Sequence, residues 1–246
     1  MATEISSSAS KALAIFTAIC ELGTPCSLAE IVRMMGYPRS VTGRMVATLM
    51  QHGFLMRKDD SGLYTVNPQV LHLSQKALQS DPLLSRVDVI MHEVCKRTGD
   101  TALFMIESGL QALVLRRSEG TAPVRILGSR LGMALPLHCG GAPTALLAFS
   151  SDEVIDAYLA GPLERRTENT LTDPEAVRRN LLETRQRGYS IGHEDLFEYV
   201  VAIGAPIYDD QNRLAGAISI GNIPQRYPPE RIEEVGRILI EEIKRS

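Results

Sequence analysis

The chain has 246 residues, which suits two modest domains, and its apolar fraction of 44% and charged fraction of 22% are ordinary for a globular protein. The formal net charge of -3 excludes a general electrostatic attraction to nucleic acid. No apolar run approaches the about 20 residues that span a bilayer, and Met1-Ala2-Thr3-Glu4 does not resemble the start of a signal peptide. We therefore expect a cytoplasmic protein with no membrane segment.

The cysteines are too scattered to form a structural framework. Cys20, Cys26, Cys95 and Cys139 include no C-x-x-C pair and have no histidine at ligand spacing. This distribution predicts buried thiols in a reducing compartment, and neither a disulfide framework nor a zinc site.

An apolar helix is predicted from about Ser10 to Leu22, after a Ser-rich segment of residues 1–9 that we expect to be disordered. Its apolar side chains cover more than one face: Ala12, Leu13, Ile15, Phe16, Ile19 and Cys20. A helix that is apolar on two sides must bury both. One face can pack on the following helices. The other can contact a second subunit, or it can belong to a well-buried core.

The segment from Ser27 to Gly53 has the pattern of two short helices joined by a tight turn. Ser27 and Glu30 fit the S-x-x-E capping box, and Gly36-Tyr37-Pro38 ends the first helix. A second helix runs from about Arg39 to His52, and we expect its inward face to consist of Val41, Met45, Thr48 and Leu49. Its exposed N-terminal half, which in a helix-turn-helix enters the DNA major groove, would carry Arg39, Ser40, Thr42, Gly43 and Arg44.

A basic hairpin follows the helix pair. Two strand-like runs, 55–58 and 63–66, enclose a turn at 59–62. Between Ile31 and Lys58 the chain has several arginines and no Asp or Glu, so this part is locally basic although the whole chain is acidic. Each piece by itself is also found in plain helix pairs and solvated turns. Their order predicts a winged helix-turn-helix that binds double-stranded DNA, with Arg57 and Lys58 contacting phosphates.

The chain is predicted to have three parts: a winged helix-turn-helix domain at 1-67, a helical linker at 68-81 and a second domain at 82-246. In the last part we expect a helix at about 82–98 and then strands near 101–106, 112–115, 200–207 and 214–220, with helices near 142–149, 152–160, 174–187 and 229–244. The helix near 174 begins at a second capping box of the S/T-x-x-E type, Thr172-Asp173-Pro174-Glu175. Antiparallel hairpins flanked by helices predict an α+β sensor-type domain.

Taken in order, short motifs along nearly the whole chain resemble the IclR family of bacterial transcriptional regulators. They are Ala12-Leu13-Ala14-Ile15, Pro38-Arg39-Ser40-Val41-Thr42-Gly43-Arg44, Leu135-Pro136-Leu137-His138, Leu146-Leu147-Ala148-Phe149, Arg187-Gly188-Tyr189-Ser190 and Ala217-Ile218-Ser219-Ile220. The resemblance implies a winged helix-turn-helix followed by a GAF-like effector-binding domain. It also implies a homo-oligomer (a dimer or dimer of dimers), a palindromic operator and a small organic effector.

The resemblance further implies where the effector binds. Position by position it indicates Cys139, Gly140, Gly141 and Ala142, the region of Gly192, His193 and Glu194, and the strand residues Ala202, Ser219 and Gly221. Gly140-Gly141 before a helix would leave backbone amides free at the positive end of the helix dipole, which suits a carboxylate. The plainer interpretation is that the two glycines only make a turn.

The chain also departs from the family pattern. Pro143-Thr144 stands where many members have Gly-Lys, and Gly192, Ala202 and Gly221 replace polar residues of small-acid sensors. We therefore expect a less polar, roomier pocket and a larger, partly apolar organic acid or aromatic-type effector. Gly43 is a departure too, because glycine inside a helix costs about 1 kcal/mol relative to alanine. It either permits close approach to DNA or reflects neutral drift.

No complete catalytic pattern is present. The sequence has no phosphate loop or dinucleotide fingerprint, and Lys96 stands where a zinc helix beginning at His92 would need its second histidine. His138 or His193 could pair with Glu194 as acid and base, which leaves open an enzyme domain with an appended DNA-binding module. A further alternative is a C-terminal domain that serves only assembly. We predict a transcriptional regulator that is not an enzyme and uses no cofactor or metal.

Overall fold

The computed structural model describes residues 5–58, 61–79, 81–123 and 128–246. The chain forms two compact units, Met1–Asp81 and Pro82–Ser246. No helix within the described ranges is both long and apolar enough to cross a membrane.

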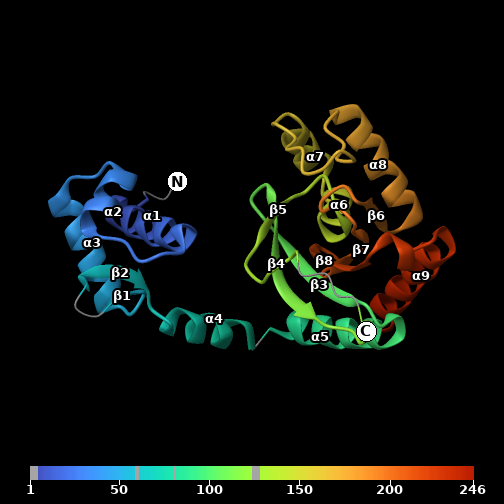
Figure 1. The fold of residues 1–246 in the computed structure, drawn as a ribbon, viewed down its shortest axis with the longest axis horizontal. Coiled ribbons are helices and arrows are strands. Elements are labelled where there is room, and N and C mark those ends of the chain that lie inside the picture. The colour runs from blue at the N-terminus through green and yellow to red at the C-terminus, as the bar shows by residue number, and fades with distance from the viewer. Residues whose placement is uncertain (1–4, 59–60, 80, 124–127) are drawn as a thin grey trace. The chain divides into compact units, whose positions relative to one another are not determined.

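The N-terminal unit packs three successive helices against a β-hairpin (Figure 1). Its elements are α1 (Ser7–Leu22), α2 (Leu28–Met35), α3 (Arg39–Gln51), β1 (Leu55–Lys58), β2 (Leu63–Val66) and α4 (Gln69–Gln79). Buried apolar side chains from α1, α2, α3 and β1 form its core: Ile15, Ile19, Ile31, Val46, Leu49 and Leu55. The side chain of Ser6 accepts a hydrogen bond from the amide of Ala9, so α1 begins at Ser7 and the segment expected to be disordered is shorter than predicted. The first four residues of that segment lie outside the described ranges.

Local signals predicted the helix-turn-helix and its hairpin correctly. The Ser27 amide donates to Glu30 Oε2 at 2.7 Å and the Glu30 amide donates to Ser27 Oγ at 3.3 Å, which completes the capping box. Strands β1 and β2 are antiparallel, with Leu55 opposite Val66, and Asp59-Asp60 of the predicted turn lie outside the described residues. Cys26, between α1 and α2, pairs with Tyr64 of β2 through N–O distances of 2.9 and 2.7 Å. The winged helix-turn-helix fold is therefore confirmed.

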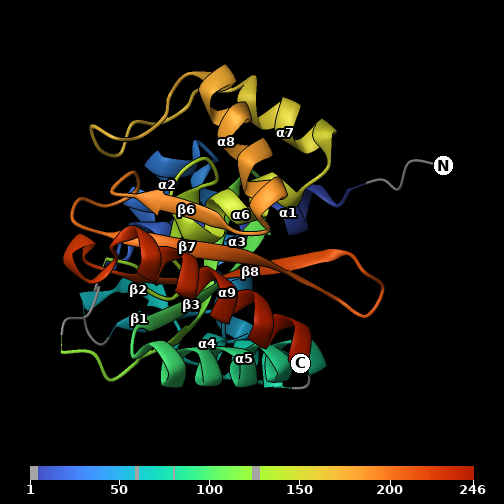
Figure 2. The same cartoon turned by 90° about the vertical axis from the view of Figure 1, so that its right-hand side faces the viewer.

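The C-terminal unit is built on one antiparallel sheet of six strands in the order β5-β4-β3-β8-β7-β6. The strands are β3 (Thr101–Ser108), β4 (Gln111–Ser118), β5 (Ala134–Pro136), β6 (Ser190–His193), β7 (Val201–Tyr208) and β8 (Leu214–Asn222). The helices are α5 (Pro82–Thr98), α6 (Gly141–Phe149), α7 (Asp152–Leu159), α8 (Pro174–Arg187), the short η2 (Pro224–Arg226) and α9 (Pro229–Arg245). Helices α6, α7 and α8 lie on one side of the sheet, and α5 and α9 lie on the other (Figures 1 and 2). The predicted α+β domain is confirmed.

Two details of this unit differ from the predictions. Strands β5 and β6 were not predicted, because each is a short edge strand and carries Pro136 or Gly192 in place of an alternating apolar pattern. Helix α8 is capped by Asp173, whose carboxylate accepts from the Ala176 amide at 3.0 Å, and not by Thr172. Pro174 occupies the first turn, where no amide donor is needed.

The cysteines also differ in part from the prediction. Cys26, Cys95 and Cys139 are buried, as expected, but Cys20 is exposed on α1. Four free thiols are thus present among the described residues, without a disulfide.

His138 is a buried, hydrogen-bonded histidine between β5 and α6, with 1% of its surface exposed. Its Nδ1 lies 2.7 Å from the Tyr158 hydroxyl oxygen, and its Nε2 lies 3.0 Å from the Glu164 carbonyl oxygen. Tyr158 also accepts from the Leu137 amide at 2.9 Å, so its own proton goes to Nδ1 and Nε2–H donates to Glu164. This arrangement fits the neutral imidazole, and burial lowers the pKa of His138.

We expect acid to destabilise the protein in part through His138. The unfolded imidazole takes up its proton near pH 6.5, whereas the pKa is lower in the folded protein. The unfolded state therefore binds more protons below about pH 6.5, and stability falls as the pH falls, by at most about 1.4 kcal/mol per pH unit. The melting temperature of His138→Gln should start below that of the wild type at about pH 7.5 but fall less on going to about pH 5.5.

Exposed His193 provides the matched control. His193→Gln removes a histidine that lies outside this buried network, so the difference between the two variants isolates the contribution of His138. Identical pH dependence in His138→Gln and the wild type would contradict the assignment of this titration to His138.

Candidate functional site

The first candidate site is a basic surface of the N-terminal unit. Arg39, Ser40 and Arg44 are exposed on α3. Gly43 is half-buried on the flank of α3 toward α2, where Leu28 Cδ2 is 4.0 Å from the position of a Cβ. Packing within the unit therefore does not require a glycine at this position.

Thr42, predicted on the DNA-facing side of α3, is fully buried. The inward face of α3 consists of Thr42, Val46 and Leu49, while Thr48, predicted inward, is exposed. The Thr42 hydroxyl donates to the Pro38 carbonyl at 3.2 Å, one helical turn earlier. Because this bond satisfies the hydroxyl within the helix, the threonine can be buried. Thr42 therefore supports the packing of α3 and is removed from the candidate DNA contacts.

The wing carries the other predicted contacts. Arg57 and Lys58 are exposed on β1, and the guanidinium carbon of Arg57 lies 5.8 Å from the ring centroid of Tyr64, its partner across the hairpin. A cation–π contact at this distance orients the arginine along the wing while leaving it at the surface.

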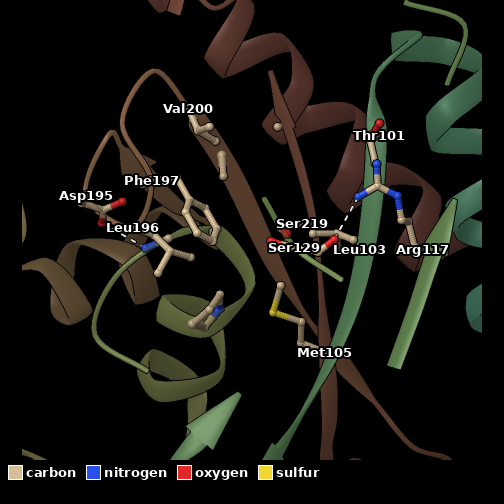
Figure 3. Close-up of a pocket in the computed structure, with 16 residues that line it drawn as sticks. Thr101, Leu103, Met105, Arg117, Ser129, Asp195, Leu196, Phe197, Val200 and Ser219 are labelled. Atoms are coloured by element: carbon tan, nitrogen blue, oxygen red, sulfur yellow. Dashed lines mark hydrogen bonds between the residues drawn. The ribbon is translucent and has the colours of Figure 1, made fainter. Parts of the chain in front are cut away.

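The second candidate site is a pocket between the sheet and the N-terminus of α6 (Figure 3). It is lined by Thr101, Leu103 and Met105 of β3, Arg117 of β4, Ser129, Gly140, Gly141 and Pro143, Gly192 of β6, Asp195, Leu196, Phe197 and Val200, Ala202 of β7, and Ser219 and Gly221 of β8. The wall is mostly apolar, as predicted. The interior leaves only about 40 Å³ for molecules of water size, so the pocket is not roomy as it stands.

The first turn of α6 lies directly on β6 and β7. A Cβ on Gly204 would come within 2.3 Å of the carbonyl carbon of Gly141, and a Cβ on Gly192 would come within 2.7 Å of Gly140. The Ser190 hydroxyl donates to the Gly141 carbonyl at 2.7 Å. Backbone therefore meets backbone, and this close approach sets the inner wall of the pocket.

The structure brings together some of the predicted effector residues. The pocket is lined by six of the expected residues, which come from α6, β6, β7, β8 and the turn before α6: Gly140, Gly141, Gly192, Ala202, Ser219 and Gly221. Their contact with an effector stays a prediction.

The pocket lining does not include the other predicted residues. Cys139, just before α6, and Ala142, in its first turn, are fully buried in the apolar core, and burial raises the pKa of the Cys139 thiol. His193 is exposed, and the carboxylate of Glu194 accepts from the Tyr199 amide at 2.9 Å, which closes the segment between β6 and β7. We therefore remove Cys139, Ala142, His193 and Glu194 from the candidate site.

The pocket also contains residues that the sequence did not reveal. Thr101, Leu103 and Met105 occupy alternate positions of β3, so strand periodicity places them on one face once the strand is known. Arg117 donates to the Ser129 carbonyl at 3.0 Å, across the long connection between β4 and β5. No sequence pattern indicated Arg117 or the segment from Asp195 to Val200.

Asp195 occupies the position where an effector carboxylate was expected. One of its carboxylate oxygens accepts from the Gly140 amide at 3.0 Å, at the positive end of the α6 dipole. Burial raises the pKa of Asp195, and its hydrogen bonds from backbone amides partly oppose that shift. The Gly140 amide, one of the donors expected to hold an effector carboxylate, is therefore taken by the protein's own side chain.

The acid–base pair considered from the sequence is not assembled at this pocket. His193 Nδ1 lies 3.8 Å from Glu194 Oε2, but neither residue lines the cavity. His138 is engaged by Tyr158 and Glu164. Across the described part of the chain, no group of three or more His, Cys, Asp or Glu side chains is placed to hold a metal ion.

Adding a methyl group at Gly204 should displace α6 and damage the pocket. Because the new Cβ would meet backbone atoms of Gly141 and Ala142 at 2.3–2.6 Å, Gly204→Ala should lower the free energy of unfolding by about 1–3 kcal/mol or more in urea titrations. Gly161→Ala is the matched control, since its Cβ would meet its nearest atom at 3.4 Å. Equal stability of the two variants would show that α6 adjusts freely at this contact.

Comparison with known proteins covers both units. Residues 75–244 match the family of bacterial transcriptional regulator IclR C-terminal domains, and residues 8–59 match the IclR helix-turn-helix domain. The chain is 30% identical over 212 residues to the HTH-type transcriptional regulator KipR of Bacillus subtilis, a match that covers 84% of this chain and 82% of KipR. This relative is a transcriptional regulator of the helix-turn-helix type.

Solved structures show the same fold. An IclR transcriptional regulator from Silicibacter sp. TM1040 has a TM-score of 0.85 and 25% identity, with 97% of this chain and 96% of that chain covered. An IclR homologue from Microbacterium hydrocarbonoxydans, solved as a complex with 4-hydroxybenzoate, has a TM-score of 0.78 and 24% identity, with 98% and 100% covered. Because the two family matches span both units and most of the sequence, the chain belongs to the IclR family of bacterial transcriptional regulators, which combine a helix-turn-helix with an effector-binding domain.

Proposed function

We propose that this regulator binds a palindromic operator in the cytoplasm as a homodimer or a dimer of dimers. We further propose that a partly apolar organic acid or an aromatic-type compound controls it from the α6 pocket. The observation that carries the first part is the exposed basic surface formed by Arg39 and Arg44 of α3 with Arg57 and Lys58 of the wing.

The charge distribution supports this surface as the DNA contact. The whole chain has a net charge of -3, yet no Asp or Glu occurs between Ile31 and Lys58. Arg44 lies on the side of α3 opposite the buried Thr42 and Val46, where a guanidinium can reach a base edge in the major groove. Arg39, Arg57 and Lys58 flank it and suit phosphate contacts, which position the protein without reading sequence.

The dimer follows from how such a surface reads DNA. One α3 helix reads one half-site, and a palindrome mirrors a two-fold axis between two subunits. The outer stripe of α1 is available for this contact, since Leu13 is 60% exposed and Thr17 and Cys20 lie beside it on the same face. Within the described part of the N-terminal unit, the second apolar face predicted for α1 is therefore exposed at Leu13 and Cys20.

The pocket supports control by a small molecule. Its lining combines apolar side chains with a few polar ones, which is the usual composition of a ligand site. The Microbacterium homologue binds an aromatic acid, 4-hydroxybenzoate. To regulate DNA binding, a ligand must bind two arrangements of the protein with different affinity.

Gly43→Ala should raise the stability of the protein and weaken its binding to the operator. The new methyl group has room within the unit, so the variant should be more stable by about 1 kcal/mol. If the glycine permits close approach to DNA, the same methyl group should weaken operator binding by about tenfold, which corresponds to about 1.4 kcal/mol. Thermal unfolding and gel shifts measure the two effects, on an operator that the wild type selects from random DNA.

Thr48→Ala is the control, because Thr48 is exposed on the same helix. It should leave operator affinity close to that of the wild type. A Gly43→Ala variant that is more stable and binds the operator normally would show that Gly43 is not a DNA contact.

A thermal-shift screen of organic and aromatic acids, followed by gel shifts with each hit, tests the effector proposal. We expect at least one acid to raise the melting temperature and to change operator affinity. Ala202→Leu would fill the pocket, so it should abolish the thermal shift while DNA binding persists. A shift that survives in Ala202→Leu would place the ligand elsewhere. The absence of any hit would favour a C-terminal domain that serves only assembly.

A further inference from the structure

The α6 pocket has opposite charges on opposite sides. Among the described residues that line it, Arg117 is the one cation and Asp195 the one anion. Arg117 comes from β4 and Asp195 from the segment after β6. Figure 3 shows them on opposite sides of the view, with Phe197, Met105 and Leu103 between them. An apolar chamber thus separates a guanidinium from a carboxylate.

Arg117 is held at the wall of the pocket. Its side chain is 15% exposed, its Nη1 donates to the Ser129 carbonyl at 3.0 Å, and its Nε lies 3.5 Å from Glu119 Oε1. The Glu119 side chain is 44% exposed, and an ion pair with so exposed a partner is weak. A ligand carboxylate inside the pocket would meet a guanidinium that is shielded from water and already positioned.

Asp195 makes the other side unfavourable for an acid. Its carboxylate accepts the hydrogen bond from the Gly140 amide, so this amide cannot bind the carboxylate of a ligand as well. A ligand carboxylate next to Asp195 would place two like charges together in a poorly hydrated site. A hydroxyl, amine or apolar group carries no such penalty, and a carboxylate can accept from a ligand donor.

We infer that Arg117 binds the single carboxylate of the effector and that Asp195 excludes a second one. The pocket then takes monocarboxylic acids with an apolar body and an uncharged or hydrogen-bond-donating far end, and it rejects dicarboxylates. This inference rests on the proposed effector function. The acid group of the effector then lies at Arg117, and not at the amides of Gly140 and Gly141 where the sequence led us to expect it.

The size of the chamber adds one requirement. An empty cavity of about 150 Å³ holds benzene, whereas this pocket leaves about 40 Å³. An aromatic or alkyl body must therefore displace part of the lining. The segment that carries Asp195, Leu196 and Phe197 is a part of the lining outside helices and strands.

Two matched sets of probes test the charge rule by calorimetry on the full chain. The aromatic set is 4-hydroxybenzoate, the neutral 4-hydroxybenzamide and the dicarboxylate terephthalate, and the alkyl set is hexanoate, hexanamide and adipate. In at least one set the monoacid should bind about tenfold or more tightly than both its amide and its diacid. The amide loses the charge-assisted hydrogen bond to Arg117, and the diacid places a second carboxylate next to Asp195.

Two variants assign the effect to the two side chains. Arg117→Gln should weaken binding of the monoacid by about tenfold and leave the amide unchanged. Asp195→Asn should strengthen binding of the diacid by about tenfold, since the like charge is gone. Arg130→Gln removes an exposed charge nearby and should change none of these affinities. If either variant fails to fold, the comparison of monoacid, amide and diacid in the wild type still decides the rule.

The outcomes separate this inference from the effector proposal. Equal affinity for monoacid and amide, or a monoacid affinity unchanged in Arg117→Gln, overturns the role of Arg117 while the pocket remains an effector site. Diacid binding as tight as monoacid binding overturns the role of Asp195. Failure of both sets to bind overturns this inference, and a thermal-shift hit of another chemical class would then preserve the effector proposal alone.

Discussion

The direct contact between the first turn of α6 and the strands β6 and β7 is the constraint on which the C-terminal unit depends. Gly192 and Gly204 leave no side chain between helix and sheet, so backbone packs on backbone. Helix α6 is then buried on all sides from Gly141 to Ala148, in a core too closely packed for it to move alone. A ligand beside the N-terminus of α6 would therefore act on an element that is coupled to the whole unit.

Asp195 links the N-terminus of α6 to the segment between β6 and β7 and to the connection between α7 and α8. Its carboxylate holds the Gly140 amide, and its own carbonyl accepts from the Thr170 hydroxyl at 2.6 Å. The neighbouring carbonyl of Glu194 accepts from the Thr167 hydroxyl at 2.7 Å. The segment between β6 and β7 is thus joined to α6 on one side and to the connection between α7 and α8 on the other. These bonds give a physical route by which a change in the pocket could alter the surface of the unit, provided that the ligand favours one arrangement.

In the N-terminal unit the determining feature is the local positive charge of α3 and the wing. The protein as a whole is slightly acidic, but the stretch from Ile31 to Lys58, which carries α3 and the first strand of the wing, contains no Asp or Glu. Burial of Thr42, Val46 and Leu49 turns Ser40 and Arg44 outward. The core of the unit therefore decides which arginines are presented, and a small error in assigning the buried face changes the set of DNA contacts.

Signals that act over a few residues were enough to predict the helix-turn-helix, its hairpin, most helix and strand positions and the family. The capping box of Ser27 and Glu30 and the prolines that begin α5, α8 and α9 act within one helical turn. The inward face of α3 could not be read reliably, because its buried position 42 is a threonine whose hydroxyl bonds within the helix. The edge strands β5 and β6 were too short to leave a pattern. The charged sides of the pocket needed the folded chain, since sheet order and loop conformation bring Arg117 and Asp195 to one cavity from positions far apart in the sequence.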